Sequence, residues 1–145
     1  VAPNMITYNA VISACQRESW QSAVNLLATM HSSGLELGVV AHNAAISACG
    51  DGMEWRRAIS ILTDMQWKAI ELDIISYSAA ISACGSCTEW PHALQLFSDM
   101  QLKGPQPNAV TYNAAICASA AGVLWQQALR LLTDMRLDTC GLDVI

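Results

Sequence analysis

The sequence predicts an all-α fold, a right-handed α-solenoid in which pairs of helices repeat along the chain and stack on one another. Three observations support this fold class. Residue types recur with a period of about 35 residues, each period contains two segments with helical features, and glycines separate those segments. The chain of 145 residues is 53% hydrophobic and 13% charged, which suits a packed core and excludes a disordered chain.

The period extends along the whole chain. It is carried by tryptophans at Trp20, Trp55, Trp90 and Trp125, by alanines at Ala23, Ala58, Ala93 and Ala128, and by methionines at Met30, Met65, Met100 and Met135. The segments TYNAVISAC, AHNAAISAC, SYSAAISAC and TYNAAICAS precede the tryptophans, and the first unit is one residue shorter than the others. We therefore predict the tail of a preceding unit at 1–4, units at 5–38, 39–73, 74–108 and 109–143, and the start of a further unit at 144–145. Because both ends match internal parts of a unit, we expect the chain to be part of a longer protein.

Each unit is predicted to form two helices. The first helix of unit 1 passes through 8–15 and is rich in small residues, and its counterparts contain 42–49, 77–84 and 112–119. The second helix passes through 20–30, with counterparts at 55–65, 90–100 and 125–135, and its apolar residues follow the spacing of an amphipathic helix. Glycines are expected to end the helices, at Gly50, Gly52, Gly85 and Gly122 after first helices and at Gly34, Gly104 and Gly141 after second helices.

Composition and motifs exclude several function classes. The net charge of −5, from 7 basic and 12 acidic residues, disfavours a broad electrostatic attachment to nucleic acid or to an anionic membrane. The apolar runs are too short to span a membrane. The sequence Cys84-Gly-Ser-Cys87 has CxxC spacing, but a zinc site needs four ligands and no second such pair is present. Catalytic motifs are missing, so we predict no enzyme, no cofactor and no metal site.

The repeat resembles that of the pentatricopeptide repeat (PPR) family in its P-type form, whose unit reads roughly VTYNxLIxxxxxxGxxxxALxLFxxMxxxGxxPD. Residues 109–143, AVTYNAAICASAAGVLWQQALRLLTDMRLDTCGLD, match it at TYN, at AL, at the late Met and at the final acidic residue. A tetratricopeptide unit fits less well, because its tryptophan lies in the first helix. The resemblance implies sequence-specific binding of single-stranded RNA, one base per repeat. It also implies a chloroplast or mitochondrial location, within a longer protein that processes or stabilises RNA.

The resemblance further implies which residues contact RNA. In the family, the fifth and last residues of a unit select the base and the second residue helps to sandwich it. The base-selecting residues are then Asn9, Gly38, Asn43, Asp73, Ser78, Asn108, Asn113 and Asp143. The sandwiching residues are Ile6, Val40, Ile75 and Val110, and Arg17 is the residue placed to contact phosphate. The Asn43/Asp73 and Asn113/Asp143 pairs resemble the type that prefers uracil, with cytosine next, and Ser78/Asn108 resembles the adenine type. Asn9/Gly38 is not a usual pair, so the implied sequence is 5′-N-U-A-U-3′.

Elementary chemistry is compatible with this assignment but leaves alternatives open. The second and fifth residues lie three apart and share a helix face, where an amide or hydroxyl offers hydrogen bonds to a base edge. Asn and Ser near a helix start are also common caps and backbone partners. The acidic balance permits a second hypothesis, a protein-interaction scaffold of the tetratricopeptide type. The periodic tryptophans are predicted to pack in the core rather than to stack on bases.

Overall fold

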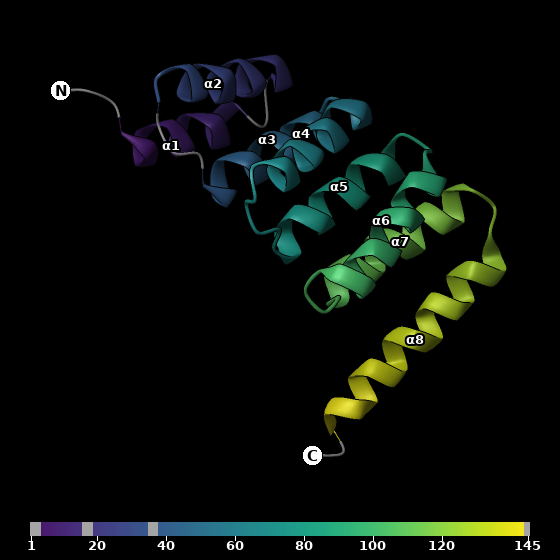
Figure 1. Cartoon of the computed structure of the whole chain (residues 1–145). Coiled ribbons are helices and arrows are strands. Elements are labelled where there is room, and N and C mark those ends of the chain that lie inside the picture. Colours follow the sequence, from purple (N-terminus) through teal and green to yellow (C-terminus); the bar gives the residue numbers. More distant parts are fainter. Residues whose placement is uncertain (1–3, 16–18, 35–37, 144–145) are drawn as a thin grey trace.

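The computed structural model describes residues 4–15, 19–34 and 38–143, with the side chains of Met5 and of 139–143 left aside. These ranges contain eight α-helices and no strand (Figure 1). The helices are α1 (Met5–Cys15), α2 (Trp20–Ser32), α3 (Val39–Asp51), α4 (Trp55–Trp67), α5 (Ile74–Ser86), α6 (Trp90–Lys103), α7 (Ala109–Ala121) and α8 (Trp125–Asp143). Each expected unit begins at the first residue of an odd-numbered helix. Among the described residues, no helix combines the length and apolarity needed to cross a membrane.

The helices form two layers. Each odd-numbered helix contacts the next odd-numbered helix and its own hairpin partner, and each even-numbered helix also contacts the odd-numbered helix that follows. Within the described ranges, no Cα atoms of two even-numbered helices lie within 8 Å of each other, and these helices meet through side chains, as Trp55 on α4 and His92 on α6 do. The odd-numbered helices therefore form a continuous inner layer, and the even-numbered helices are spaced apart on the outside. This arrangement is the predicted all-α solenoid.

Small side chains explain why the inner layer is closely packed. Helix α3 is buried through a run that includes Ala41, Ala44, Ala45 and Ala48. A Cβ atom added at Gly50 would lie 3.1 Å from the Cβ of Ala83 on α5, so these two helices approach almost to backbone contact. A larger side chain at either position would force the helices apart. The alanine-rich first segment of each unit thus sets the spacing of the stack.

The helix ends agree only in part with the glycine pattern. Gly52 and Gly122 are the C-cap residues of α3 and α7, as expected. The prediction is wrong for Gly141, which lies inside α8. Gly50 and Gly85 also lie inside their helices, in the last turn of α3 and α5. After α3, α5 and α7 the chain turns at non-glycine residues in the left-handed region, namely Met53, Thr88 and Val123, with φ of 60°, 61° and 58°. Ala69 after α4 (φ 57°) does the same, whereas after α2 the residue with positive φ is Gly34 (74°).

Both layers contribute large apolar side chains to the core, and Ile12, Ile46 and Ile81 come from the inner helices. Met30, Met65 and Met100 are fully buried, as are the alanines Ala23, Ala58 and Ala93. Trp20, Trp55 and Trp90 are half-buried and pack against the hydrophobic core, whereas Trp125 is 64% exposed and differs from the expectation of core packing. Trp20, Trp55 and Trp90 also contact the following unit, at Gly52, His92 and Gly122.

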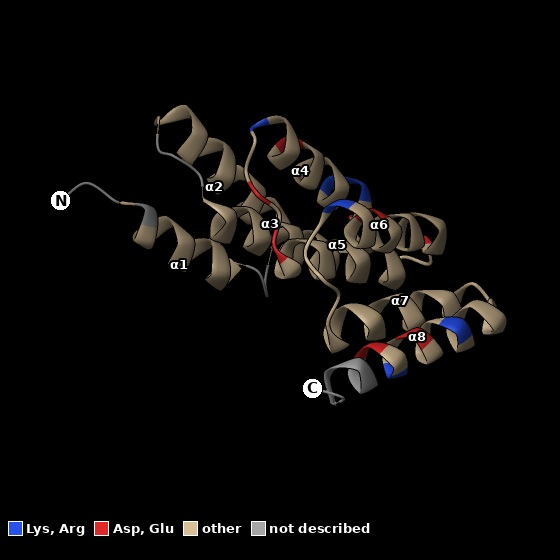
Figure 2. Ribbon diagram, turned by 60° about the horizontal axis from the view of Figure 1, so that its bottom comes forward, with Lys and Arg blue, Asp and Glu red and all other residues tan. Residues whose placement is uncertain are grey.

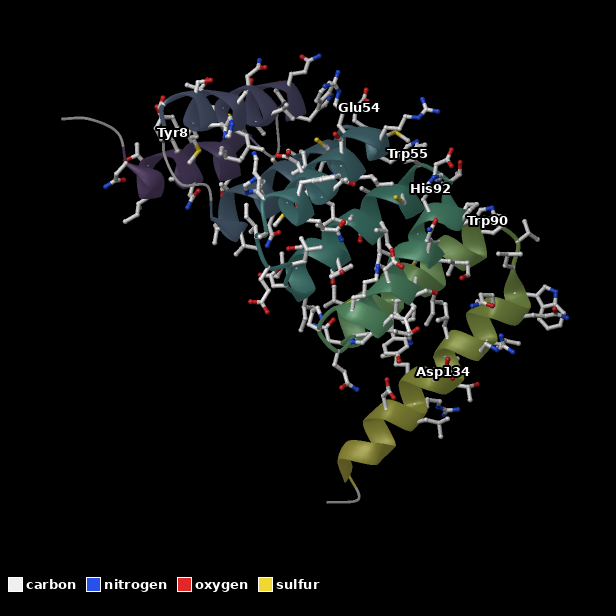
Figure 3. The ribbon with its side chains drawn as sticks, viewed as in Figure 1. Tyr8, Glu54, Trp55, Trp90, His92 and Asp134 are labelled. Carbon is white, nitrogen blue, oxygen red and sulfur yellow. The ribbon has the colours of Figure 1, made fainter. Side chains whose placement is uncertain are left out.

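Two contacts illustrate how the tryptophans pack. A Cβ atom at Gly52 would come within 2.1 Å of Cδ1 of Trp20, so the indole lies directly on that turn and requires glycine there. The Trp55 and His92 rings face each other, with centroids 4.7 Å apart (Figure 3). The tryptophans therefore join successive units along the outer layer. The contacts that place them there are with turns and outer helices, away from the second and fifth positions of each unit.

Candidate functional site

The second residue of every unit presents an aliphatic side chain to solvent from an inner-layer helix. Ile6, Val40, Ile75 and Val110 lie on α1, α3, α5 and α7 and are between 57% and 77% exposed. Such exposure is costly for isoleucine and valine, which are mostly found inside proteins. Repeated once per unit, these four residues form a regular apolar row along the inner layer.

One open hollow brings together four of the residues that the family resemblance implies in RNA contact. Ile75 and Ser78 from α5, Asn108 before α7 and Val110 on α7 all line it. Its floor continues along polar and small residues of α3 and α5, namely Ser47, Gly50, Asp51, Ile74, Ala79, Ser82, Ala83 and Ser86. The second, fifth and last residues of the third unit thus share one concave site with the second residue of the fourth unit.

At the junction between units 2 and 3, the fifth and last residues of unit 2 are directly bonded. Nδ2 of Asn43 donates to Oδ1 of Asp73 at 3.1 Å. Oδ1 of Asn43 accepts a hydrogen bond from the hydroxyl of Ser76 at 2.6 Å. Asn43 is 6% exposed, and its side chain bonds to side chains rather than to backbone. The predicted alternative, a local cap or backbone partner, therefore does not apply to this residue.

The carboxyl group of Asp73 is held in its charged form. Burial raises its pKa, but hydrogen bonds from the Ser76 backbone and hydroxyl and from Asn43 outweigh that effect, and the pKa is lowered from its ordinary value of 3.8. Asp73 consequently stays ionised at neutral pH. It provides acceptor oxygens only, next to the amide of Asn43.

The last residues of the units also cap the helices that follow. Asp73 and Asn108 are the N-caps of α5 and α7, and each forms a reciprocal capping box with the third residue of the next unit. Gly38 takes the same place before α3 and provides no side-chain bond. Capping is thus a function of the last position, whereas sequence reasoning had weighed it for the fifth position.

The remaining predicted residues fall into three groups. Ser78 is buried and its hydroxyl lies 3.3 Å from that of Thr111. Asn9 is half-buried and Asn113, in the last unit, is exposed. The side chain of Asp143 and the whole of Arg17 lie outside the described residues.

Sequence reasoning missed the third residue of each unit. Ser76 and Thr111 are fully buried and bond to the fifth residue of the preceding unit. The signal was present, because a hydroxyl recurs at this position in Thr7, Ser76 and Thr111, with Ala41 as the exception. The family resemblance implies contact with the base only for the second, fifth and last positions of a unit.

The electrostatics of the inner layer are nearly neutral. All Lys and Arg residues in the described ranges lie on even-numbered helices or directly after them, at Arg56, Arg57, Lys68, Lys103, Arg130 and Arg136 (Figure 2). Asp51 is the one charged residue within the inner-layer helices α1, α3, α5 and α7 as described. A ligand of this surface would therefore be recognised through hydrogen bonds and apolar contacts more than through charge.

The buried thiols of Cys49 and Cys84 are unsuited to nucleophilic chemistry. Burial raises the pKa of Cys84 to about 12 and that of Cys49 to about 11, so both remain protonated at neutral pH. No group of three or more His, Cys, Asp or Glu in the described part of the chain is arranged to hold a metal ion. Cys49, Cys84 and the equivalent Ser119 are buried, and they act as small packing residues.

Comparison with solved structures supports the solenoid assignment. PPR10 from maize superimposes with a TM-score of 0.78 and 29% sequence identity, over 96% of this chain and 20% of that one. PPR10 in complex with an 18-nt psaJ RNA element gives a TM-score of 0.82 at 19% identity, over 95% and 20% of the two chains. The chain spans about a fifth of the PPR10 structures that it matches.

A second solved protein has the same fold. The PPR domain of Arabidopsis thaliana protein-only RNase P 1, in complex with tRNA, gives a TM-score of 0.79 at 14% identity, over 94% of this chain and 72% of that one. Among curated proteins, no significant sequence match was found. Two family models match the sequence itself, one described as PPR repeat family over residues 73–121 and one as PPR repeat over residues 6–35. The chain belongs to the pentatricopeptide repeat family.

Proposed function

We propose that this chain binds single-stranded RNA along its inner layer, with one base held at each junction between units. The observation that carries the proposal is the hollow that joins Ile75, Ser78, Asn108 and Val110. Two exposed aliphatic side chains there flank a hydroxyl and an amide. This combination suits a flat ring whose edge carries hydrogen-bonding groups. The PPR structures solved with RNA support the same choice of ligand.

The base preferences follow from the pairs of residues at each junction. Asn43 with Asp73 offers an amide donor beside an acceptor, which fits the carbonyl and N3–H groups of uracil. Ser78 with Asn108 is assigned to adenine, and Asn113 with Asp143 to uracil. The proposed sequence is 5′-N-U-A-U-3′, with the base at Asn9/Gly38 open. Asn9, Gly38, Asn113 and Asp143 are included through their place in the repeat.

The affinity of these units alone is expected to be low. Stacking and edge contacts contribute about 1–3 kcal/mol per base, and association costs about 4–15 kcal/mol. Because the inner-layer helices carry no Lys or Arg, few phosphates are neutralised and the affinity depends only weakly on salt. A longer array, of the length seen in PPR10, would add further junctions. We assign the chain to such an RNA-processing or RNA-stabilising protein of a chloroplast or mitochondrion.

The acidic surface also suits a second class of ligand, a peptide bound as in tetratricopeptide scaffolds. Scaffolds of that kind need charged or large apolar anchors. The hollow instead presents serines, an amide and aliphatic residues, with Asp51 as its one charged lining residue and without an aromatic side chain. RNA is therefore the preferred ligand of this site.

A titration with short labelled RNA tests the proposal. Fluorescence anisotropy at low salt would compare an RNA containing UAU with RNAs in which one of these bases is replaced. We expect Asn43→Ala to abolish the preference at the first U and Ser78→Ala to abolish that at A. Asn25→Ala and Ser98→Ala, on exposed positions of α2 and α6, are the matched controls. Equal binding of scrambled RNA by the unmodified chain would refute the proposal.

A gain of preference provides a stronger test, since a misfolded variant cannot produce it. The double substitution Asn43→Ser with Asp73→Asn gives unit 2 the residue pair of unit 3. We expect its preference to change from uracil to adenine. Retention of uracil would show that these residues do not select the base.

A further inference from the structure

The three junctions between units differ in a position that the proposed base selection does not include. This is the third residue of the following unit, which is Ala41 at the first junction, Ser76 at the second and Thr111 at the third. Ser76 and Thr111 are fully buried. A buried hydroxyl is costly unless it is hydrogen-bonded, so its partners indicate what it does.

At the second junction, the partners of Ser76 determine the orientation of the Asn43 amide. A carboxylate cannot donate, so Nδ2 of Asn43 must face Asp73, and Oδ1 must face Ser76. The Ser76 hydroxyl lies 2.6 Å from Oδ1 of Asn43 and 2.8 Å from Oδ1 of Asp73. The latter atom already accepts bonds from the Ser76 N–H and from Asn43. The single hydroxyl proton is shared between Asn43 and Asp73, and it keeps Oδ1 of Asn43 turned toward Ser76 while Nδ2 donates to Asp73.

At the third junction, Thr111 plays the same part for a different side chain. Its hydroxyl donates to Oδ1 of Asn108 at 2.8 Å and accepts from the Asn108 N–H at 3.2 Å. Because the Thr111 hydroxyl donates its hydrogen to Asn108, its oxygen accepts a hydrogen bond from the Ser78 hydroxyl, with the two oxygens 3.3 Å apart. Ser78 consequently presents oxygen lone pairs, whereas Asn43 presents an N–H group.

The first junction shows the result when the hydroxyl is missing. Ala41 replaces it and Gly38 replaces the capping side chain. There, Oδ1 of Asn9 is buried without a hydrogen-bond partner among the described residues. Nothing in the described part of that junction fixes which end of the Asn9 amide faces a ligand.

We propose that Ser76 and Thr111 are positioning residues for base selection. Each one fixes the direction in which the fifth residue of the preceding unit donates or accepts. The inference rests on the proposed function, because it concerns the same RNA site. It adds a fourth position to the second, fifth and last, and it predicts that unit 1 selects its base weakly even though Asn9 is present.

The test compares Ser76→Ala with Ser76→Thr in the full chain, with Ser98→Ala as the matched control. The readout is the ratio of affinities for RNAs with U or A opposite unit 2. A hydrogen bond of ordinary strength predicts that Ser76→Ala lowers this ratio about three- to tenfold, while Ser76→Thr retains it because threonine serves at the third junction. A role confined to stability would weaken both RNAs equally and leave the ratio unchanged, which would overturn the inference.

A gain-of-function variant protects the test against misfolding of Ser76→Ala. Ala41→Ser supplies a donor for Oδ1 of Asn9, and we expect the chain to acquire a preference of about threefold at the first base. No change at that base would contradict the inference. Failure of the unmodified chain to bind any RNA would instead refute the proposed function, so the two failures are distinguishable.

Discussion

The first and second junctions of this solenoid have the same arrangement of helices, but they differ in the hydrogen bonds that the asparagine at the fifth position makes. At the second junction, Asn43 is bonded to both Asp73 and Ser76. At the first, Gly38 and Ala41 stand in those two places and the carbonyl oxygen of Asn9 is buried without a described partner. Repeats that look interchangeable in sequence are therefore not equivalent in energy. The difference arises from two side chains, not from the helices.

This contrast separates two roles of the last residue of a unit. Asp73 caps α5 and also binds Asn43, so one carboxylate stabilises a helix and orders a recognition residue. Gly38 performs neither role with a side chain, yet α3 still begins at Val39. Packing of the inner layer is thus sufficient to form the helix. The polar network is an addition that serves the site.

The largest effect is expected from removing the shared carboxylate. Asp73→Ala removes the cap of α5 and leaves Asn43 and Ser76 without their common partner. We expect the free energy of unfolding to fall by about 2–3 kcal/mol, measured by urea denaturation. Asp64→Ala, at an exposed position of α4, is the control and should change little. An effect no larger than the control would mean that the two junctions are energetically alike.

Replacing the asparagine at the fifth position by alanine in each of the two units compares the junctions directly. Asn43→Ala breaks a satisfied network and should cost about 1–2 kcal/mol. Asn9→Ala removes a buried oxygen that has no described partner, so its cost should stay within about 0.5 kcal/mol of zero. Thermal unfolding followed by circular dichroism would measure both. Equal losses would contradict the contrast drawn above.

Introducing the hydrogen-bonding side chains of the second junction into the first should supply the partners that Asn9 lacks. The double substitution Gly38→Asp with Ala41→Ser supplies a cap for α3 and partners for Asn9. The backbone of Gly38 is extended, with φ −81° and ψ 172°, and so accepts an aspartate. We expect a gain of about 1 kcal/mol. A loss of stability in chemical denaturation would show that the first junction cannot accommodate the network.

The two junctions should also respond to acid in different pH ranges. His42 is fully buried, and since Gly38 O can only accept, Nδ1 of His42 carries the proton and Nε2 is left without a described partner. Burial lowers the pKa of His42 from its ordinary value of 6.5. The unfolded chain therefore binds this proton more readily, and the stability that His42 contributes is lost as pH falls below 6.5. The pKa of Asp73 is lowered from 3.8, so its contribution persists until pH falls below that value.

Unfolding curves recorded between pH 8 and pH 4 would reveal the His42 contribution. His42→Phe keeps a ring at a position that holds tyrosine in the other units, and it removes the titrating group. We expect the variant to lose less stability than the unmodified chain between pH 7 and pH 5. Parallel curves for the two proteins would exclude His42 as the source of the acid response.

The fold was largely accessible from the sequence, because the repeat and the helical apolar pattern depend on local residue types. The positions of α1 to α7 follow from the spacing of Trp20 and its counterparts and from the alanine-rich segments. The end of α8 did not follow, since Gly141 at a helix end and Gly141 inside a helix look the same in sequence. The left-handed turns at Met53, Thr88 and Val123 were also unexpected, because such residues rarely adopt positive φ.

The site could be predicted from the sequence only in outline. Family resemblance identified Asn43, Asp73, Ser78 and Asn108, and the structure places these side chains together at two junctions. The bonds from Ser76 and Thr111 were not accessible, because they join residues 33 positions apart through a contact between helices. The unsatisfied oxygen of Asn9 was hidden for the same reason. Polar networks across units depend on tertiary geometry that no single segment encodes.

The unequal spacing of the two layers has a mechanical consequence. The backbones of successive odd-numbered helices lie close together, whereas the even-numbered helices of the described ranges meet one another through side chains, as at Trp55 and His92. Small rotations between units can therefore change the spacing of the even-numbered helices while the odd-numbered helices of the inner layer stay closely packed. The molecule is expected to bend about its inner layer of helices. Such bending lets the distance between neighbouring sites adjust to the spacing of successive units in a flexible polymer.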